Sequence, residues 1–180
     1  MPLPKEQIYT IDDIYALPDT LRAELIDGRI YYMAPPSRKH QRIVLSLSRK
    51  IADYIDAKGG SCEVNISPFG VFLNENDSTY LEPDISVVCD PNKLSDRGCE
   101  GAPDWIIEIV SPGSRQHDYL TKLFLYRPAG VLEYWLVDPD KNRITVYDFA
   151  KNEQNEYSFT DVVPVGIYSD FSIDFGQVRF

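Results

Sequence analysis

Apolar residues recur every three or four positions between residues 37 and 58, which is the period of an amphipathic helix. Ser37 is a favoured N-cap residue, and the pair Gly59-Gly60 is typical of the position where a helix ends. The pattern therefore predicts one long helix with a single buried face. That face consists of Ile43, Val44, Leu47, Ile51, Tyr54 and Ile55.

Short apolar runs bounded by turn residues predict β-strands over residues 61–66, 70–73, 83–88, 104–110, 133–137 and 143–149. The runs at 83–88 and 104–110 are rich in Ile and Val, as in central strands that are buried on both faces. The pair Asp27-Gly28 lies between two further apolar runs and predicts an N-terminal hairpin. Residues 157–159 and 171–175 are expected to add edge strands.

Two more helices complete the predicted elements. Thr10, with Asp13 three residues later, forms the capping pattern of a short helix that ends at Pro18. The second main helix is expected from about His117 to Arg127, ending before Pro128. Because no repeat or linker interrupts the chain, we predict a single domain over residues 1–180. Its class is α/β, with a mixed β-sheet flanked by helices and an N-terminal hairpin.

The composition excludes several classes of protein. Of the 180 residues, 43% are hydrophobic and 26% are charged, which is typical of a globular chain. No apolar run is long enough for a membrane span, and the first residues lack the apolar stretch of a secretory signal. We therefore expect a cytoplasmic protein that does not enter the membrane. Three widely spaced cysteines argue against a disulfide framework and against a cysteine zinc site.

The chain carries a formal net charge of −10, with a pI of about 4.6. Affinity for nucleic acid comes largely from basic residues that neutralise phosphates. The charge therefore excludes a protein that coats DNA generally. Binding to nucleic acid would require a local basic strip or carboxylates that hold cations.

Carboxylates occur within the two runs predicted as buried strands. The triplet Glu82-Pro83-Asp84 opens one run, and Glu108 lies inside the other. A buried carboxylate is costly unless a cation compensates it. If the strands are neighbours, Asp84 and Glu108 could bind one Mg²⁺ ion, together with the backbone carbonyl of Ile109. Alternatively, both are strand-end carboxylates that form salt bridges or caps.

Asp118, Lys122 and Tyr126 are four residues apart and share one face of the predicted second helix. Lys122 could orient an attacking water or stabilise charge on a phosphate. Alternatively, Lys122 forms an ordinary ion pair with Asp118 on the protein surface. Paired carboxylates also occur in glycoside hydrolases, but that class predicts neither this lysine nor a basic helix face.

Seven motifs occur in an order that resembles the bacterial Uma-type family of proposed restriction endonucleases, in the PD-(D/E)XK nuclease superfamily. The resemblance covers roughly residues 10–175. The motifs are Glu24-Leu-Ile-Asp-Gly28; Met33-Ala-Pro-Pro-Ser37 with His40-Gln41; Glu82-Pro-Asp84; Gly101-Ala-Pro-Asp104; Glu108-Ile-Val-Ser-Pro112; Asp118 with Lys122 and Tyr126; and Glu133-Tyr-Trp-Leu-Val-Asp-Pro139.

The resemblance implies a role for each matching residue and a restriction-endonuclease-like core. Asp84 and Glu108 correspond to the two metal-binding acids, and Glu24 to an additional acid of the metal site. The superfamily's lysine two positions after the second acid is here Val110, and Lys122 resembles its replacement on the following helix. Of the accessory positions, Asp118 and Tyr126 share the face of Lys122. The family histidine corresponds to His40, for which a packing or hydrogen-bonding role competes with a catalytic one.

The implied activity is hydrolysis of phosphodiester bonds, in DNA, by a Mg²⁺-dependent endonuclease in which Mn²⁺ can substitute. Nucleases of this superfamily often dimerise to cut both strands, so a homodimer is expected. Candidate phosphate contacts are Arg38, Arg42, Arg49 and Arg115, although arginines on an outer helix face are also typical of a solvated surface. The competing hypothesis is a catalytically silent module that acts in binding or regulation.

Overall fold

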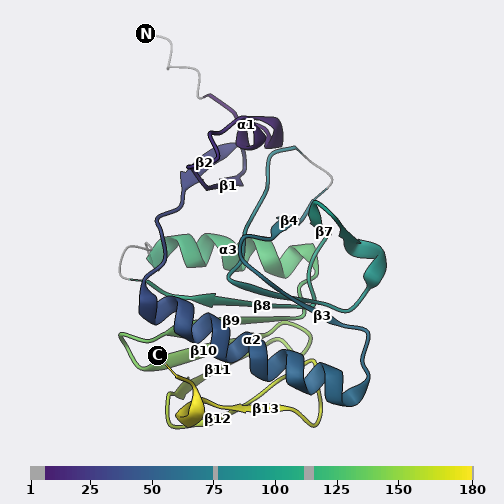
Figure 1. Ribbon diagram of the computed structural model, residues 1–180, viewed down its shortest axis with the longest axis vertical. Helices are drawn as coiled ribbons and strands as arrows, with labels where there is room; N and C mark the ends of the chain where they lie inside the picture. Colours follow the sequence, from purple (N-terminus) through teal and green to yellow (C-terminus); the bar gives the residue numbers. More distant parts are fainter. Residues whose placement is uncertain (1–6, 75–76, 112–115, 180) are drawn as a thin grey trace.

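The computed structural model describes residues 7–74, 77–111 and 116–179, and for residues 116–118 it describes the backbone alone. Figure 1 shows the elements in place. In chain order they are α1 (Ile11–Tyr15), β1 (Ala23–Ile26), β2 (Arg29–Tyr32), α2 (Arg38–Lys58), β3 (Glu63–Ile66), β4 (Gly70–Phe72), β5 (Ile85–Val88), η1 (Pro91–Lys93), β6 (Leu94–Ser95), β7 (Gly98–Glu100), β8 (Trp105–Ile109), α3 (Gln116–Ala129), β9 (Glu133–Asp138), β10 (Arg143–Asp148), β11 (Glu153–Ser158), β12 (Val162–Pro164), β13 (Ser172–Asp174) and η2 (Phe175–Gln177).

A six-stranded sheet in the order β11-β10-β9-β8-β5-β3 organises the molecule. The pair β8–β9 is parallel, and the other neighbouring strands of this sheet are antiparallel. Smaller sheets are formed by β1-β2, by β12-β13 and by β4-β7-β6. The sheet is thus mixed, and β5 and β8 are each buried on both faces, as predicted. The two strands are neighbours in the sheet.

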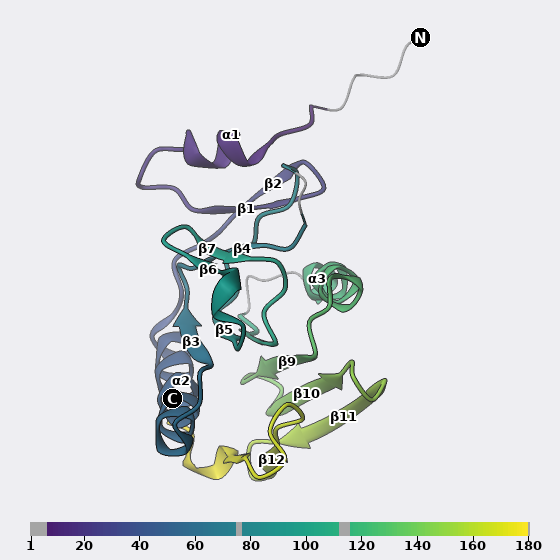
Figure 2. The ribbon, with the colours of Figure 1, turned by 90° about the vertical axis from the view of Figure 1, so that its right-hand side faces the viewer.

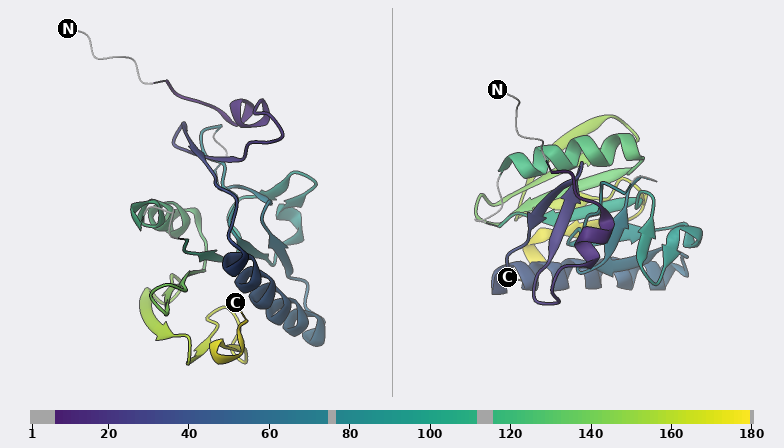
Figure 3. Two further views of the ribbon diagram at one scale, coloured as in Figure 1. Left: turned by 60° about the vertical axis from the view of Figure 1, so that its left-hand side comes forward. Right: turned by 90° about the horizontal axis from the view of Figure 1, so that it is seen from above.

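Helices α2 and α3 cover opposite faces of the sheet, as the right-hand view of Figure 3 shows. Ile107 and Ile109 of β8 pack into the core cluster that contains α2. Ile106, which alternates with them, packs with residues of α3. Because successive strand residues point to opposite faces, Glu108 points towards α3. This alternation brings an acidic side chain beneath the helix that carries Lys122.

Helix α2 confirms the predicted amphipathic pattern. The Ser37 hydroxyl accepts a hydrogen bond from the backbone N–H of His40, and Gly59 ends the helix at φ 62°. Its buried face includes Ile43, Leu47 and Ile51, each fully covered. The N-terminal turn of this long element thereby fixes the position of His40.

Helix α3 continues through Pro128 to Ala129, so the prediction of an end before the proline is wrong. The N–H of Gly130 (φ 98°) bonds to the carbonyl of Arg127, and that of Val131 bonds to Tyr126. These two bonds form a Schellman cap. Proline is tolerated because only one hydrogen bond is lost in the last turn.

The N-terminal hairpin has the predicted turn, with Asp27 at φ 48° and Gly28 at φ 76°. The hairpin and α1 form one end of the molecule, and β12 and β13 lie at the opposite end (Figures 1 and 2). Leu25 exchanges two backbone hydrogen bonds with Tyr80, each 2.8 Å long. The hairpin is therefore attached to the segment that leads into β5.

A disulfide joins Cys62 to Cys89, contrary to the expectation from cysteine spacing. The two cysteines are 27 positions apart in the sequence, but antiparallel pairing of Glu63 with Val88 places them opposite each other. Cys99 is buried and free. Within the described ranges, no helix has the length and apolar character required to cross a membrane.

Candidate active site

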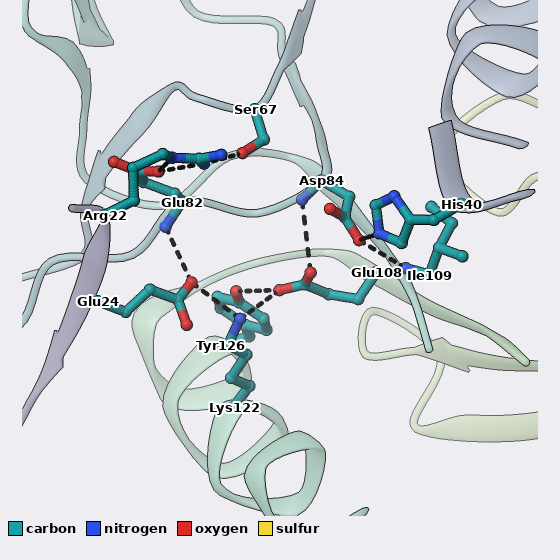
Figure 4. Close-up of polar contacts among 10 residues, drawn as sticks. All are labelled: Arg22, Glu24, His40, Ser67, Glu82, Asp84, Glu108, Ile109, Lys122 and Tyr126. Carbon is teal, nitrogen blue, oxygen red and sulfur yellow. Dashed lines mark hydrogen bonds and ion pairs between the residues drawn. The ribbon is translucent and has the colours of Figure 1, made fainter. Parts of the chain in front are cut away.

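Four separate parts of the chain bring acidic and basic side chains together at one end of β5 and β8 (Figure 4). Strand β1 supplies Glu24, the residue before β5 is Asp84, β8 supplies Glu108 and α3 supplies Lys122. We call these four residues the carboxylate cluster. All four were candidates from the sequence, and the fold brings them into one connected set of contacts.

The Lys122 ammonium lies between two glutamates. Its Nζ is 2.9 Å from Glu24 Oε1 and 2.8 Å from Glu108 Oε1, and the Tyr126 hydroxyl donates to the same Glu108 oxygen over 3.2 Å. Lys122 is only 8% exposed, so it is a buried cation and not half of a surface pair. The predicted shared face of Lys122 and Tyr126 is correct, whereas the side chain of Asp118 lies outside the described residues.

Burial and charge act in opposite directions on the pKa values of this pair. Burial raises the pKa of Glu108, Lys122 lowers it, and the charges of Asp84 and Glu24 raise it again, to about 7. Burial lowers the pKa of Lys122, but the charges of Glu108 and Glu24 outweigh this effect and raise it well above its usual value. Lys122 is therefore an ammonium at neutral pH.

Asp84 is oriented through one of its two carboxylate oxygens. Its Oδ2 accepts a hydrogen bond from the Ile109 backbone N–H over 2.8 Å and lies 3.0 Å from His40 Nε2. No described residue donates to Oδ1. The arrangement leaves that oxygen available to a ligand.

His40 forms a hydrogen bond from the first turn of α2, which agrees with the hydrogen-bonding role considered for it. Burial lowers the pKa of His40, but the hydrogen bond to Asp84 and the charges of Asp84 and Glu108 raise it above its usual value. Its Nδ1 is buried without a hydrogen-bond partner among the described residues. The contact of His40 is therefore made by Nε2.

A second set of polar contacts was missed in the sequence. Arg22 donates from Nε to Glu82 Oε2 over 3.0 Å and from Nη2 to the Ser67 hydroxyl over 2.6 Å. Tyr80 donates its hydroxyl proton to Glu82 Oε1 over 2.9 Å, and the Glu82 N–H donates to Glu24 Oε1 over 3.0 Å. A signal was present, because Arg22 directly precedes β1 and lies two positions before Glu24, the spacing at which side chains of an extended segment share one face.

The candidate arginines lie apart from the carboxylate cluster. Arg38, Arg42 and Arg49 are exposed on the outer side of α2 and have no contact with the cluster in the described part of the chain. Arg115 lies outside the described residues. The proposed phosphate contacts of all four remain predictions.

The described ranges contain no group of three His, Cys, Asp or Glu side chains that forms a ready metal cluster. The available donors nevertheless suit a hard divalent cation, which prefers oxygen ligands. Asp84 Oδ1 is unengaged, and Glu108 Oε2 accepts only a long, 3.4 Å bond from the Asp84 N–H. The Ile109 carbonyl points to the same side of β8 as the Ile109 N–H, towards Asp84.

The charge of the carboxylate cluster also fits a bound cation. Three carboxylates, from Glu24, Asp84 and Glu108, face the single ammonium of Lys122. Neighbouring Glu82 is already neutralised by Arg22. The excess of negative charge in a buried place is the condition under which a divalent cation stabilises a site.

A groove of about 570 Å³ begins at Val110 and Ser111, directly after β8. Leu120 of α3 and Tyr147 of β10 are among its lining residues. It lies beside the carboxylate cluster, none of whose members lines it. The groove gives the α3 face of the sheet an open, partly apolar surface next to the acids.

The fold belongs to the mixed α/β class. It matches the crystal structure of a protein from Anabaena variabilis described as "a putative nuclease belonging to DUF820". The TM-score is 0.78 at 23% sequence identity, and the match covers 94% of this chain and 96% of that one. This likeness confirms the predicted fold class.

The chain belongs to the Uma2 family, described as "Putative restriction endonuclease", whose model matches residues 11–173. This match confirms the resemblance found in the sequence motifs. Two relatives from Synechocystis are both named as uncharacterized proteins. One, slr1290, is 31% identical over 135 residues, covering 74% of this chain and 68% of its own length. The other, sll1609, is 28% identical over 138 residues, covering 75% and 76% respectively.

Proposed function

We propose that this protein is a divalent-metal-dependent endonuclease that hydrolyses phosphodiester bonds in DNA. The observation that carries the proposal is the buried Lys122 ammonium held between Glu24 and Glu108, next to Asp84. Membership of the Uma2 family and the nuclease-like fold support the same class of activity.

The residues that would hold Mg²⁺, or Mn²⁺ in its place, are Asp84, Glu108 and the carbonyl of Ile109. When bound, the ion supplies Lewis acidity, which polarises a phosphate and lowers the pKa of a coordinated water. His40 and the Ile109 N–H hold Asp84 Oδ2, and so turn Oδ1 to the ligand side. Tyr126 holds Glu108 Oε1 in the same way.

Lys122 orients the attacking water and stabilises negative charge on the phosphate. In the metal-free protein, the charges of Glu108 and Glu24 raise the pKa of Lys122 and keep the amine protonated. The protonated amine can act as a charged hydrogen-bond donor. Glu24 keeps the ammonium in position through a 2.9 Å contact.

Contacts with the DNA backbone are assigned to Arg38, Arg42 and Arg49 on α2, with Arg115. The first three are exposed, as phosphate-binding side chains must be. Two copies of the chain would be needed to cut both strands of a duplex in one encounter, so we propose a homodimer.

Two features favour the alternative of a catalytically silent binding or regulatory module. The net charge is −10, and Val110 occupies the position where the superfamily has a lysine. The complete set of Glu24, Asp84, Glu108 and Lys122 favours the enzyme, because a module without catalysis has no need to keep three costly buried charges and a partly buried fourth.

A plasmid-nicking assay in Mg²⁺ and in Mn²⁺ tests the proposal. We expect wild-type protein to nick supercoiled DNA, and Asp84→Asn and Lys122→Met to lose the activity. Asp53→Asn, on the exposed side of α2, is the matched control and should cleave like wild type. Cleavage that survives in Asp84→Asn would point to a contaminant, and no cleavage by wild type would favour the binding module.

A further inference from the structure

Arg22 is the partly exposed cation beside the carboxylate cluster. Its side chain is 37% exposed, whereas the side chain of its partner Glu82 is only 10% exposed. Figure 4 shows Arg22, Ser67 and Glu82 together next to Glu24, at the opposite side of the drawn residues from His40. The guanidinium therefore lies where the interior of the site meets solvent.

The guanidinium is held in one orientation. Its Nε and Nη2 both donate to Glu82 Oε2, and Nη2 also donates to the Ser67 hydroxyl. Glu82 is itself fixed, since Tyr80 donates to its other oxygen and its N–H donates to Glu24. A guanidinium has five N–H donors, and the two on Nη1 bond to no described residue.

A purely structural role does not require this arrangement. Strand β1 is already attached by two backbone hydrogen bonds between Leu25 and Tyr80 and by the bond from Glu82 to Glu24. A partly exposed ion pair adds little to such an attachment. The attachment of β1 therefore does not explain why the Nη1 group of Arg22 is held in place while it bonds to no described residue.

A polyanion that approaches this site meets three carboxylates. Lys122 acts on them from the interior, where its Nζ is buried and contacts Glu24 and Glu108. Arg22 is a cation beside the cluster with both solvent access and unused donors. Its planar fork suits the oxygens of a phosphate, which it can bind with two parallel hydrogen bonds.

We propose that Arg22 contacts a phosphate of the DNA strand bound at the carboxylate cluster, and that Glu82 is the positioning residue for its guanidinium. The proposal rests on the proposed nuclease function and adds a substrate-contacting residue to it. Arg22 supplies an anion contact from the hairpin side of the site, opposite to the arginines of α2.

The test measures binding of a fluorescent DNA duplex by anisotropy over a range of salt concentrations, with Ca²⁺ as the divalent ion. We expect Arg22→Gln to weaken binding about tenfold. The slope of log affinity against log salt concentration, called the salt slope below, should become shallower by about 0.9, the value of one lost phosphate contact.

Arg22→Lys should keep most of the salt slope because it keeps the charge. Glu82→Gln should weaken binding but leave the slope unchanged. Arg29→Gln, an exposed arginine on neighbouring β2, should change neither.

A merely structural Arg22 gives a different pattern. Arg22→Gln and Glu82→Gln would then lower the melting temperature equally, and each would bind DNA with the wild-type salt slope. That result overturns the proposal.

A second probe separates this proposal from the proposed function. The Nε–Hε resonance of Arg22, assigned by its disappearance in Arg22→Lys, is followed by NMR while inorganic phosphate is added. If wild type binds no duplex, DNA as the substrate is wrong. A saturable shift of the Arg22 resonance then still supports the anion contact, and the absence of a shift overturns it.

Discussion

Lys122 carries its positive charge into a part of the protein that water barely reaches, where the side chains of Glu24 and Glu108 are 8% and 6% exposed. Each of these three groups would be costly to bury alone. Together they form a triad in which the lysine offsets two carboxylates. The same residue that serves the proposed chemistry is therefore also required for the stability of the metal-free protein.

Removal of the Lys122 charge is expected to destabilise the fold strongly. Lys122→Met preserves the length of the side chain but leaves two buried glutamates unpaired, which costs about 3–5 kcal/mol for a broken buried pair. Urea denaturation of the metal-free protein measures this loss. Lys151→Met breaks the pair with Asp148 at a mostly exposed lysine and should change little. Equal losses in the two variants would contradict a buried role for Lys122.

The metal-free protein should become less stable as the pH rises through neutrality. Between pH 4.5 and about 7, an unfolded chain has lost the Glu108 proton while the folded protein retains it. The folded state then binds more protons, so the free energy of unfolding falls as the pH increases. The raised pKa of His40 acts in the same direction above pH 6.5.

Melting curves in EDTA from acidic to mildly alkaline pH measure this dependence, and Glu108→Gln should flatten it. Because a cation competes with the Glu108 proton, Mg²⁺ should raise the melting temperature more at alkaline than at acidic pH. Asp84→Asn should abolish the Mg²⁺ effect at every pH. A Mg²⁺ effect that is independent of pH would exclude Glu108 as a ligand.

At the scale of the elements, the N-terminal hairpin matters because β1 carries Glu24. Its turn depends on Gly28, at φ 76°, where an added Cβ would lie 2.5 Å from Cγ2 of Ile8. Gly59, at φ 62°, ends α2 with nothing within 4 Å of an added Cβ. The two glycines thus share a left-handed backbone but differ in the space around them.

This difference predicts unequal costs for the same substitution. Gly59→Ala should lose about 1–2 kcal/mol, the cost of the left-handed conformation alone. Gly28→Ala should lose more, because Ile8 must also move, and it should disturb the contact between Glu24 and Lys122. Urea denaturation of both variants provides the comparison. A smaller loss at Gly28 than at Gly59 would contradict the close packing of the turn.

Local patterns were sufficient to predict most of the elements. The hairpin at Asp27-Gly28, the helix capped by Ser37 and the buried strands all follow from short-range signals. The predicted end of α3 is wrong because the Schellman cap at Gly130 ends the helix and Pro128 does not.

Contacts between distant residues were harder to predict. Motif resemblance indicated the carboxylate cluster, but pairing between Arg22 and Glu82 joins residues 60 positions apart. The disulfide of Cys62 with Cys89 depends on strand register, which cysteine spacing does not reveal.

At the scale of the whole molecule, the proposed function requires an acidic chain to bind a polyanion. The net charge of −10 opposes approach to DNA at long range. The proposed binding would therefore rely on local groups, such as the arginines of α2, Arg22 and a bound divalent ion. The expected cytoplasmic location also remains a prediction, and a disulfide is more typical of oxidising compartments.

The proposed homodimer can be tested by sedimentation equilibrium. We expect a mass of twice that of the chain, because one carboxylate cluster can hydrolyse only one strand at a time. A monomeric protein should convert supercoiled plasmid to the nicked form and accumulate it, whereas a dimer should also produce linear DNA. If sedimentation gives the mass of one chain and the plasmid accumulates only in the nicked form, the proposed homodimer is wrong.

The carboxylate cluster draws on Glu24, Asp84, Glu108 and Lys122, so nearly 100 residues separate its first member from its last. Contacts of such long sequence separation form late, because the entropy of closing the loops must be offset first. Until α3 docks on the sheet, a chain emerging from the ribosome holds scattered acids and no assembled site. Any hydrolytic activity is thereby restricted to molecules that have finished folding.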